Sequence, residues 1–280
     1  MTDLSQVVTL PRVTIITSTY NCAEALAKTA VSIREQSYRN IQWIVADGAS
    51  IDGTVEAIKA NQDIVSQWFS EPDRGIYDAW NKACRLIDGD WILFLGAGDL
   101  LASSDILEKI AEHSLTLDSS VVVIYGNVVL MKPDGTPRYL SRKPLLDYFE
   151  FGRPALPHHQ GVFQNRQLFS CDESFDASYR IAGDSKFLLL ASKKGGFVHL
   201  DINVGMMAAG GISNNYKNIF VARSEIARLC CDLGVSVPKW RKILADINRV
   251  YLYVGHKMLS EKMKAVTQKI LDKLRAIKLL

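Results

Sequence analysis

Polar loops follow three of the predicted β-strands, and their residue types suit the binding of a nucleoside. Residues 18–21 (STYN) follow the first strand, residues 47–54 (DGASIDGT) the second, and residues 96–99 (GAGD) the fourth. An aromatic ring stacks on a base, a carboxylate accepts a hydrogen bond from a base N–H, and glycine lets the backbone approach a ligand closely. Tyr20 and Asp47 are therefore candidate base-binding residues.

The same loops have an alternative interpretation as turns and helix caps. Asp, Ser and Gly are common in turns, and Asp is a favoured N-cap. Asp52 would then cap a helix that begins near Thr54, with Ser50 in the turn before it. A binding role is favoured for Asp47 and Asp99, because ligands of parallel sheets bind at the carboxyl ends of the strands.

Alternating strand and helix patterns must position these loops. Runs of β-branched and apolar residues predict strands at 13–17, 41–46, 64–69, 91–95 and 121–125. Apolar residues at three-to-four spacing predict helices between them, through Leu26, Ala30 and Ile33 and through Ile76, Trp80 and Cys84. Trp80 is expected in the core. The alternation predicts an α/β fold with a Rossmann-like, mostly parallel sheet and helices on both faces.

Composition excludes several protein classes. The chain has 280 residues, of which 48% are hydrophobic and 22% charged, and a formal net charge of +3, which excludes disordered and collagen-like proteins. Its five cysteines form no CxxC pair, so we expect reduced thiols in a cytoplasmic protein without disulfides or a zinc site. We also expect no signal peptide and no membrane span, because no window reaches ~18 apolar residues.

Basic residues concentrate near the C-terminus. Residues 217–280 hold 14 Lys and Arg against 5 Asp and Glu, a balance of +9, whereas residues 1–216 balance to −6. Residues 239–280 show a helical pattern with one apolar side. We predict a domain at 1–215 and a basic helical extension at 216–280, which meets an anionic membrane surface. Packing on the domain or a homodimer contact is the alternative.

Five motifs in order give the chain a family resemblance. They are VTIITSTYN, IVADGASIDGT, EPDRGIYDAWNKA, DWILFLGAGDLL and FDASYRIAGDSKFLLLASKKGG, the last followed by GGIS at 210–213. Over residues 12–215 the chain resembles glycosyltransferase family 2, the inverting, nucleotide-sugar-dependent transferases with the A-type (GT-A) fold. EPDRGIYDA and AGD are similar to motifs of bacterial enzymes that build O-antigen, colanic acid and capsular polysaccharides.

The resemblance implies a role for individual residues. Asp99 would coordinate a divalent metal, Mn²⁺ or Mg²⁺, on the donor diphosphate, and Asp184 would be the catalytic base, with helix capping as its alternative role. Arg74 would lie against the base and the diphosphate. The predicted nucleotide- and donor-binding residues are Ser18, Thr19, Tyr20, Asp47, Arg74, Asn81 and Gly98.

These motifs contain fewer acidic residues than they do in many members of that family. Gly48, Gly96 and Gly98 stand where those members carry further acids. One carboxylate with diphosphate oxygens is sufficient in principle for Mg²⁺ or Mn²⁺, so Asp99 keeps its predicted role. The adjacent pair His158 and His159 would contact the acceptor or the diphosphate, with a plain loop role as the alternative.

The implied reaction moves one hexose-type sugar from a nucleotide sugar, most commonly a UDP-sugar, to a glycan. The chain lacks the QxxRW motif and the membrane spans of processive synthases, which favours a single addition. The expected acceptor is a polyprenyl-diphosphate-linked oligosaccharide at the inner face of the bacterial plasma membrane, and no nucleic-acid partner is expected. The alternatives are a degenerate nucleotide-sugar-binding or scaffold domain and a sugar nucleotidyltransferase. The first loop, which has no glycine and no basic residue, disfavours the nucleotidyltransferase.

Overall fold

Two compact units make up the protein. The computed structural model describes residues 9–132, 136–140, 149–150, 153–169, 173–208, 218–239, 243 and 246. The first unit comprises residues 1–143, 157–177 and 187–208, and the second comprises residues 144–156, 178–186 and 209–280. None of the boundaries between these units falls at residue 215. The division into a domain at 1–215 and an extension at 216–280 therefore stays a prediction.

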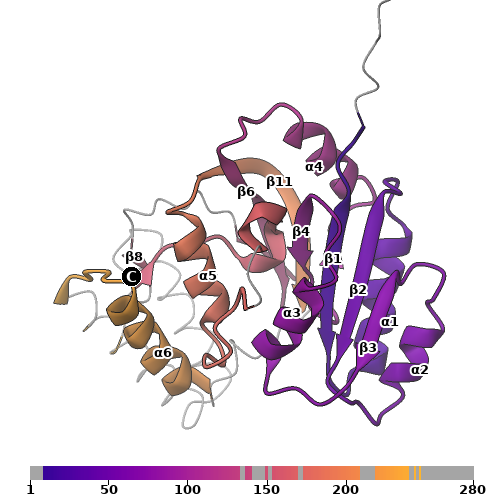
Figure 1. Ribbon diagram of the computed structural model, residues 1–280, viewed down its shortest axis with the longest axis horizontal. Coiled ribbons are helices and arrows are strands. Elements are labelled where there is room, and N and C mark those ends of the chain that lie inside the picture. The colour runs from indigo at the N-terminus through magenta and orange to yellow at the C-terminus, as the bar shows by residue number, and fades with distance from the viewer. Residues whose placement is uncertain are drawn as a thin grey trace, which may run out of the picture. The chain divides into compact units, whose positions relative to one another are not determined.

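A nine-stranded sheet forms the first unit. Its order is β3 (Gln67–Ser70), β2 (Ile41–Asp47), β1 (Val13–Thr19), β4 (Trp91–Phe94), β10 (Val162–Asn165), β6 (Val121–Met131), β11 (Gly196–Ala208) and β5 (Leu100–Leu101), and β7 (Pro137–Leu140) pairs with β6. β3, β2, β1 and β4 are parallel, as are β6 and β11. β10, β7 and β5 run antiparallel to their neighbours. Figure 1 shows β4, β1, β2 and β3 side by side.

All five predicted strands are present, and two of them have a bound that differs from the prediction by three residues or more. β3 begins at Gln67 because the N–H groups of Ile64 and Val65 both bond to the carbonyl of Asn61 and close a turn there. β6 continues past the predicted end to Met131. β10, which the sequence did not predict, lies antiparallel between β4 and β6.

Helices cover both faces of this sheet, as predicted. α1 (Ala23–Arg34) and α4 (Ile106–Ser114) share a hydrophobic core with Val13 and Ile15 of β1, and α2 (Thr54–Lys59) packs beside α1. On the other face, α3 (Ile76–Cys84) places the buried Trp80 ring 4.4 Å from that of Phe94. Successive strand residues point to opposite faces, so Leu93 and Phe94 supply one layer each. The expected core position of Trp80 is confirmed.

The second unit is built from separated stretches of chain. It contains the hairpin of β8 (Phe149–Glu150) and β9 (Arg153–Pro154), the segment 178–186, and α6 (Ile219–Asp232), which packs against β9. The segment 178–186 includes the first residues of α5 (Gly183–Ala191). Two short 3₁₀ helices, η1 (His159–Gly161) and η2 (Arg166–Phe169), belong to the first unit.

The predicted C-terminal helical stretch lies almost wholly outside the described residues. Residues 239, 243 and 246 are helical, and the other residues between 240 and 280 are not described. Among the helices that the structure describes, none has the length and apolar character needed to cross a membrane.

Candidate active site

Four parallel strands end close together at one edge of the sheet. Thr19 of β1 pairs in register with Asp47 of β2, which pairs with Ser70 of β3, so these three strands end level. β4 ends at Phe94, opposite Ile16, and the chain continues into the loop 96–99. The three polar loops therefore leave the sheet at the edge where parallel sheets bind their ligands.

Asp47 is buried at this edge, with only 1% of its surface exposed. Its Oδ1 accepts hydrogen bonds from the hydroxyls of Thr19 (2.8 Å) and Ser50 (2.5 Å), and its Oδ2 accepts from the Ser50 N–H (2.9 Å) and the Ser70 hydroxyl (2.6 Å). Burial raises the pKa of Asp47, but these hydrogen bonds outweigh burial and the pKa lies below its ordinary value. A carboxylate offers about four lone-pair positions, so a base N–H must replace one of these donors.

Asp52 acts at the start of two helices. Its carboxylate accepts hydrogen bonds from the N–H and the hydroxyl of Thr54 (3.1 and 2.5 Å) and from the N–H of Ala23 (3.2 Å), the first residue of α1. The prediction that Asp52 is the N-cap is wrong, because the N-cap residue of α2 is Gly53, which has a φ of 96°. A positive φ of this size favours glycine. Asp52 is therefore a turn residue that organises the loop.

Tyr20, Gly48 and Asp73 meet beside Asp47. A Cβ atom at Gly48 would lie 2.6 Å from Asp73 Oδ2 and 3.4 Å from Tyr20 Cδ2, so only glycine fits without a shift. The Tyr20 side chain is 68% exposed, which leaves its ring accessible for stacking. Asp73 is not among the predicted site residues, although it stands in the EPDRG motif directly before Arg74. An accessible ring beside a carboxylate suits a nucleoside.

Arg74 extends from the loop before α3, and 76% of its side chain is exposed. Its Nη2 donates to Asp78 Oδ1 (2.8 Å) and its backbone N–H donates to Asp78 Oδ2 (3.2 Å). The hydrogen bond from the Arg74 guanidinium lowers the pKa of Asp78. A guanidinium carries five N–H donors, so this pair is compatible with a second, anionic partner such as a diphosphate.

Two of the predicted donor-binding side chains are engaged within the protein. Asn81 is buried, its Nδ2 donates to the carbonyl of Phe175 (2.7 Å), and its Oδ1 accepts from the Phe175 N–H (2.8 Å). The Ser18 hydroxyl accepts a hydrogen bond from Trp80 Nε1 (3.2 Å). This geometry gives Asn81 the role of anchoring the Phe175 backbone, and the prediction that it contacts the donor gains no support.

The buried hydroxyl of Thr29 in α1 forms hydrogen bonds with the backbone of the loop 96–99. Thr29 Oγ1 accepts a hydrogen bond from the Gly98 N–H (2.9 Å) and donates to the Asp99 carbonyl (2.9 Å). Gly98 has a φ of 93°, and a Cβ atom at Gly96 would lie 2.8 Å from Asp99 Oδ2. The backbone therefore favours glycine at position 98, and a larger residue at position 96 would displace the Asp99 carboxylate.

Asp184 lies in the first turn of α5, in the second unit, and is half-buried. Its Oδ1 accepts a hydrogen bond from the Ser185 N–H (2.7 Å). Because α5 begins at Gly183, Asp184 stands inside the helix, and its alternative role as the N-cap is not supported. The dipole of a helix favours negative charge in the first turn, which suits a carboxylate that must be ionised to accept a proton.

Comparison with known proteins identifies the family. The sequence model described as glycosyl transferase family 2 matches residues 14–173, which include β2 to β4, all of β1 after Val13, and the sheet-edge loops. The chain belongs to glycosyltransferase family 2. The resemblance inferred from the five motifs is confirmed, and the protein is a glycosyltransferase.

Two relatives of this glycosyltransferase come from mycobacteria. An uncharacterized glycosyltransferase of Mycobacterium tuberculosis is 32% identical over 184 residues, 65% of this chain and 69% of the relative. A PGL/p-HBAD biosynthesis glycosyltransferase of Mycobacterium bovis is 29% identical over 245 residues, 84% of this chain and 93% of the relative.

Solved structures establish the GT-A fold. A mannosyltransferase of Pyrobaculum calidifontis, solved with GDP-Man and Mn²⁺, matches with a TM-score of 0.64 at 18% identity, over 95% of this chain and 81% of that one. S. aureus TarS (residues 1–349), solved with UDP-GlcNAc, matches with a TM-score of 0.60 at 15% identity, over 90% and 77%.

The glycines that replace acids in this family 2 protein have a steric explanation. Gly48 abuts Asp73, Gly96 abuts the Asp99 carboxylate, and Gly98 has a left-handed backbone. A larger residue at Gly48 or Gly96 would displace the Asp73 or Asp99 carboxylate, and a larger residue at Gly98 would strain the backbone. The absence of acidic residues at these three positions is therefore consistent with the packing of these loops.

A metal at this site would depend on one protein carboxylate. Among the described residues, no group of three or more His, Cys, Asp or Glu side chains is placed to hold a metal ion. Asp99 offers hard carboxylate oxygens, which Mg²⁺ and Mn²⁺ prefer, and Mg²⁺ sites commonly use one or two carboxylates completed by phosphate oxygens and water. The residues present thus fit an ion that binds together with a diphosphate.

His158 and His159 lie at the start of η1, and both are half-buried. The His159 ring lies 5.7 Å from the Trp80 ring, beside the aromatic cluster that covers this face of the sheet. This contact gives His159 a packing role. The expected contact of the two histidines with an acceptor or diphosphate stays a prediction.

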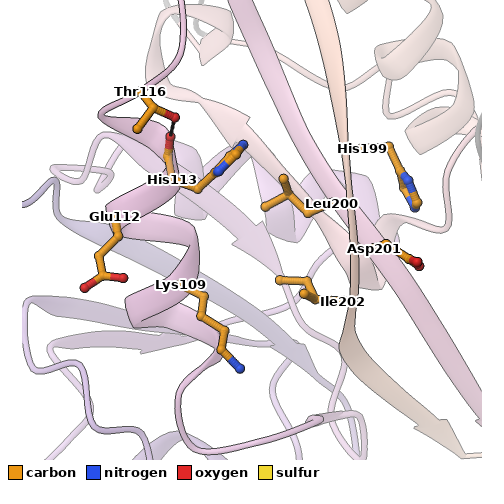
Figure 2. Close-up of a pocket in the computed structure, with 8 residues that line it drawn as sticks. All are labelled: Lys109, Glu112, His113, Thr116, His199, Leu200, Asp201 and Ile202. Atoms are coloured by element: carbon orange, nitrogen blue, oxygen red, sulfur yellow. Dashed lines mark hydrogen bonds between the residues drawn. The ribbon is translucent and has the colours of Figure 1, made fainter.

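A shallow groove of about 500 Å³ lies over α4 and β11. Figure 2 shows Leu200 and Ile202 directed toward α4, whereas His199 and Asp201 point away from it. The lining residues are Lys109, Glu112, His113, Thr116, His199, Leu200, Asp201 and Ile202. None of the predicted site residues lines this groove, so it is not the candidate active site.

Proposed function

We propose that this glycosyltransferase moves one hexose-type sugar from a UDP-sugar to a polyprenyl-diphosphate-linked glycan, with inversion at the anomeric carbon. The observation that carries the proposal is the group of Tyr20, Asp47 and Asp73 at the sheet edge where the Asp99 loop also begins. The two solved neighbours, which are complexes with GDP-Man and UDP-GlcNAc, support a nucleoside diphosphate sugar as donor.

The reaction needs a proton acceptor on one side of the sugar and positive charge on the other. We assign Asp184 as the base that takes the proton from the acceptor hydroxyl as its oxygen bonds to the anomeric carbon. The bond from that carbon to the diphosphate oxygen breaks as the new bond forms, which inverts the configuration. Arg74 offsets the negative charge that develops on the departing diphosphate. A divalent ion held by Asp99 and the diphosphate would add further positive charge.

Changing Asp47 to alanine is expected to weaken UDP binding by roughly 1 to 3 kcal/mol, the cost of leaving buried hydrogen-bonding groups without a partner. The change removes the acceptor for Thr19, Ser50 and Ser70 as well as the proposed base contact. Isothermal titration calorimetry with UDP, and with GDP in parallel, measures the effect.

Asp63→Ala is the matched control for Asp47→Ala, because Asp63 is an exposed carboxylate paired with Arg34. It is expected to bind UDP as the wild type does. Arg74→Ala tests the diphosphate contact in the same titration. Unchanged UDP affinity in both Asp47→Ala and Arg74→Ala would remove the nucleotide assignment, and tighter binding of GDP than UDP would change the donor base.

The basic extension is proposed to meet an anionic membrane, because residues 217–280 carry a balance of +9. Each Lys or Arg near an anionic surface contributes about 1 kcal/mol. Deleting residues 257–280 is therefore expected to reduce co-sedimentation with anionic vesicles, while transfer to a soluble acceptor persists. If the intact protein does not sediment with such vesicles even at low salt, where electrostatic attraction is strongest, membrane binding is contradicted and a homodimer contact of the extension is favoured.

A further inference from the structure

α6 carries a buried carboxylate that the proposed reaction does not use. Glu225 is 9% exposed, and it accepts hydrogen bonds from three consecutive backbone N–H groups. The donors are Arg180 (2.6 Å), Ile181 (2.8 Å) and Ala182 (2.9 Å), which directly precede α5 and Asp184. All of these residues belong to the second unit.

These three hydrogen bonds fix the backbone that leads into α5. A buried charge is costly unless it is paired or hydrogen-bonded, and bonds to an ionised acceptor are stronger than neutral ones. Three donors converging on one carboxylate give residues 180–182 a single backbone arrangement. Asp184 lies two residues after Ala182, the last of the three residues bonded to Glu225, and within the first turn of α5.

The same face of α6 holds both ends of the segment 178–186. Arg228 Nη2 donates to the Ser178 hydroxyl oxygen (2.6 Å), and its guanidinium lies 4.4 Å from the centre of the Tyr179 ring. The Tyr179 hydroxyl donates to Asp232 (2.8 Å), which also lies 3.4 Å from Lys186 Nζ. Spacings of three and four residues place Glu225, Arg228 and Asp232 on one side of the helix.

We infer that Glu225 is a positioning residue for the catalytic base. By holding residues 180–182, it sets where the Asp184 carboxylate meets the acceptor hydroxyl. A base works only within hydrogen-bond reach of its proton, about 2.6 to 3.2 Å, and a displacement of about 1 Å can cost roughly 100-fold in rate. The inference rests on the proposed role of Asp184. It gives α6, which lies in the predicted extension, a part in the reaction.

Glu225→Gln tests this role with little change in size. A glutamine side chain has one acceptor oxygen in place of two, and its NH₂ group would face backbone donors. We expect kcat to fall by about 100-fold with the KM for the donor unchanged. Hydrogen exchange of the amides in a peptide spanning 178–186 should become faster. Arg223→Gln, which breaks an exposed α6 ion pair with Asp246, is the matched control and should change neither quantity.

The outcomes separate this inference from the proposed function. Wild-type transfer by Glu225→Gln, or a lower kcat with unchanged exchange of 178–186, overturns the positioning role and leaves the proposed function intact. If the wild type transfers no sugar, the proposed function is wrong. Hydrogen exchange still tests Glu225 in that case: if the amides of 178–186 exchange at the same rate in Glu225→Gln as in the wild type, Glu225 does not hold residues 180–182 in place. Should Glu225→Gln not fold, Glu225→Asp keeps the charge but shortens the side chain by one methylene, and it must lower kcat and speed the exchange of 178–186 without raising the KM for the donor.

Discussion

Replacing Asp184 with asparagine is expected to lower kcat for sugar transfer by roughly 100- to 10,000-fold, the usual contribution of a general base. The amide keeps the size and shape of the side chain but cannot take a proton from the acceptor hydroxyl. We have proposed other residues for donor binding, so the KM for the donor should stay near its wild-type value. Steady-state kinetics, with donor affinity measured by calorimetry, separate the two quantities.

Asp118→Asn is the matched control for this experiment. It removes the charge of an exposed carboxylate that accepts a hydrogen bond from the Ser120 N–H, and it should leave kcat unchanged. Transfer by Asp184→Asn at the wild-type rate would place the inverting base on another residue. A loss of donor affinity in the same variant would indicate that Asp184 binds the donor instead.

Changing Asp99 to asparagine is expected to reduce turnover by at least about 100-fold, because a metal held by Asp99 would supply several kcal/mol of charge stabilisation at the diphosphate. The side chain keeps its shape but loses the negative charge that would attract the ion. UDP binding, measured over a series of Mn²⁺ concentrations, should therefore lose its dependence on the metal. The change in metal dependence distinguishes this variant from Asp184→Asn.

Asp105→Asn is the control for the metal test, because Asp105 is an exposed acid on the same stretch of chain that pairs with Lys109. It should retain the metal dependence of the wild type. If Asp99→Asn retains it too, the ion is held elsewhere or is not used. A wild-type protein that binds UDP but transfers no sugar from any donor would favour the alternative of a degenerate binding domain.

The sequence predicted the part of the fold that depends on local pattern. The strands at 13–17 and 41–46 and the helix through Leu26 and Ile33 were predictable because their apolar periodicity is strong. The sheet-edge loops followed from the rule that ligands bind at the carboxyl ends of parallel strands. Asp47 and Asp99 were accordingly predicted to lie at that edge.

Contacts between distant parts of the chain could not be predicted in the same way. β10 is a short strand whose place depends on antiparallel pairing with both β4 and β6. Asn81 was a reasonable donor contact from its helix position, but its amide is taken by the backbone of Phe175. Glu225 carries no local signal, because its three hydrogen bonds reach back to residues 180–182.

The position of β10 has a consequence for how the chain folds during synthesis. β4 is completed at Phe94, but the strand that covers its second edge begins only at Val162. At about 5 to 20 residues per second, translation leaves that edge without its partner for several seconds after β4 emerges. Its sequence, WILF, is wholly buried in the finished sheet. The nascent chain therefore exposes an apolar strand edge, the kind of surface that recruits chaperones or neighbouring chains, until the antiparallel insertion closes it.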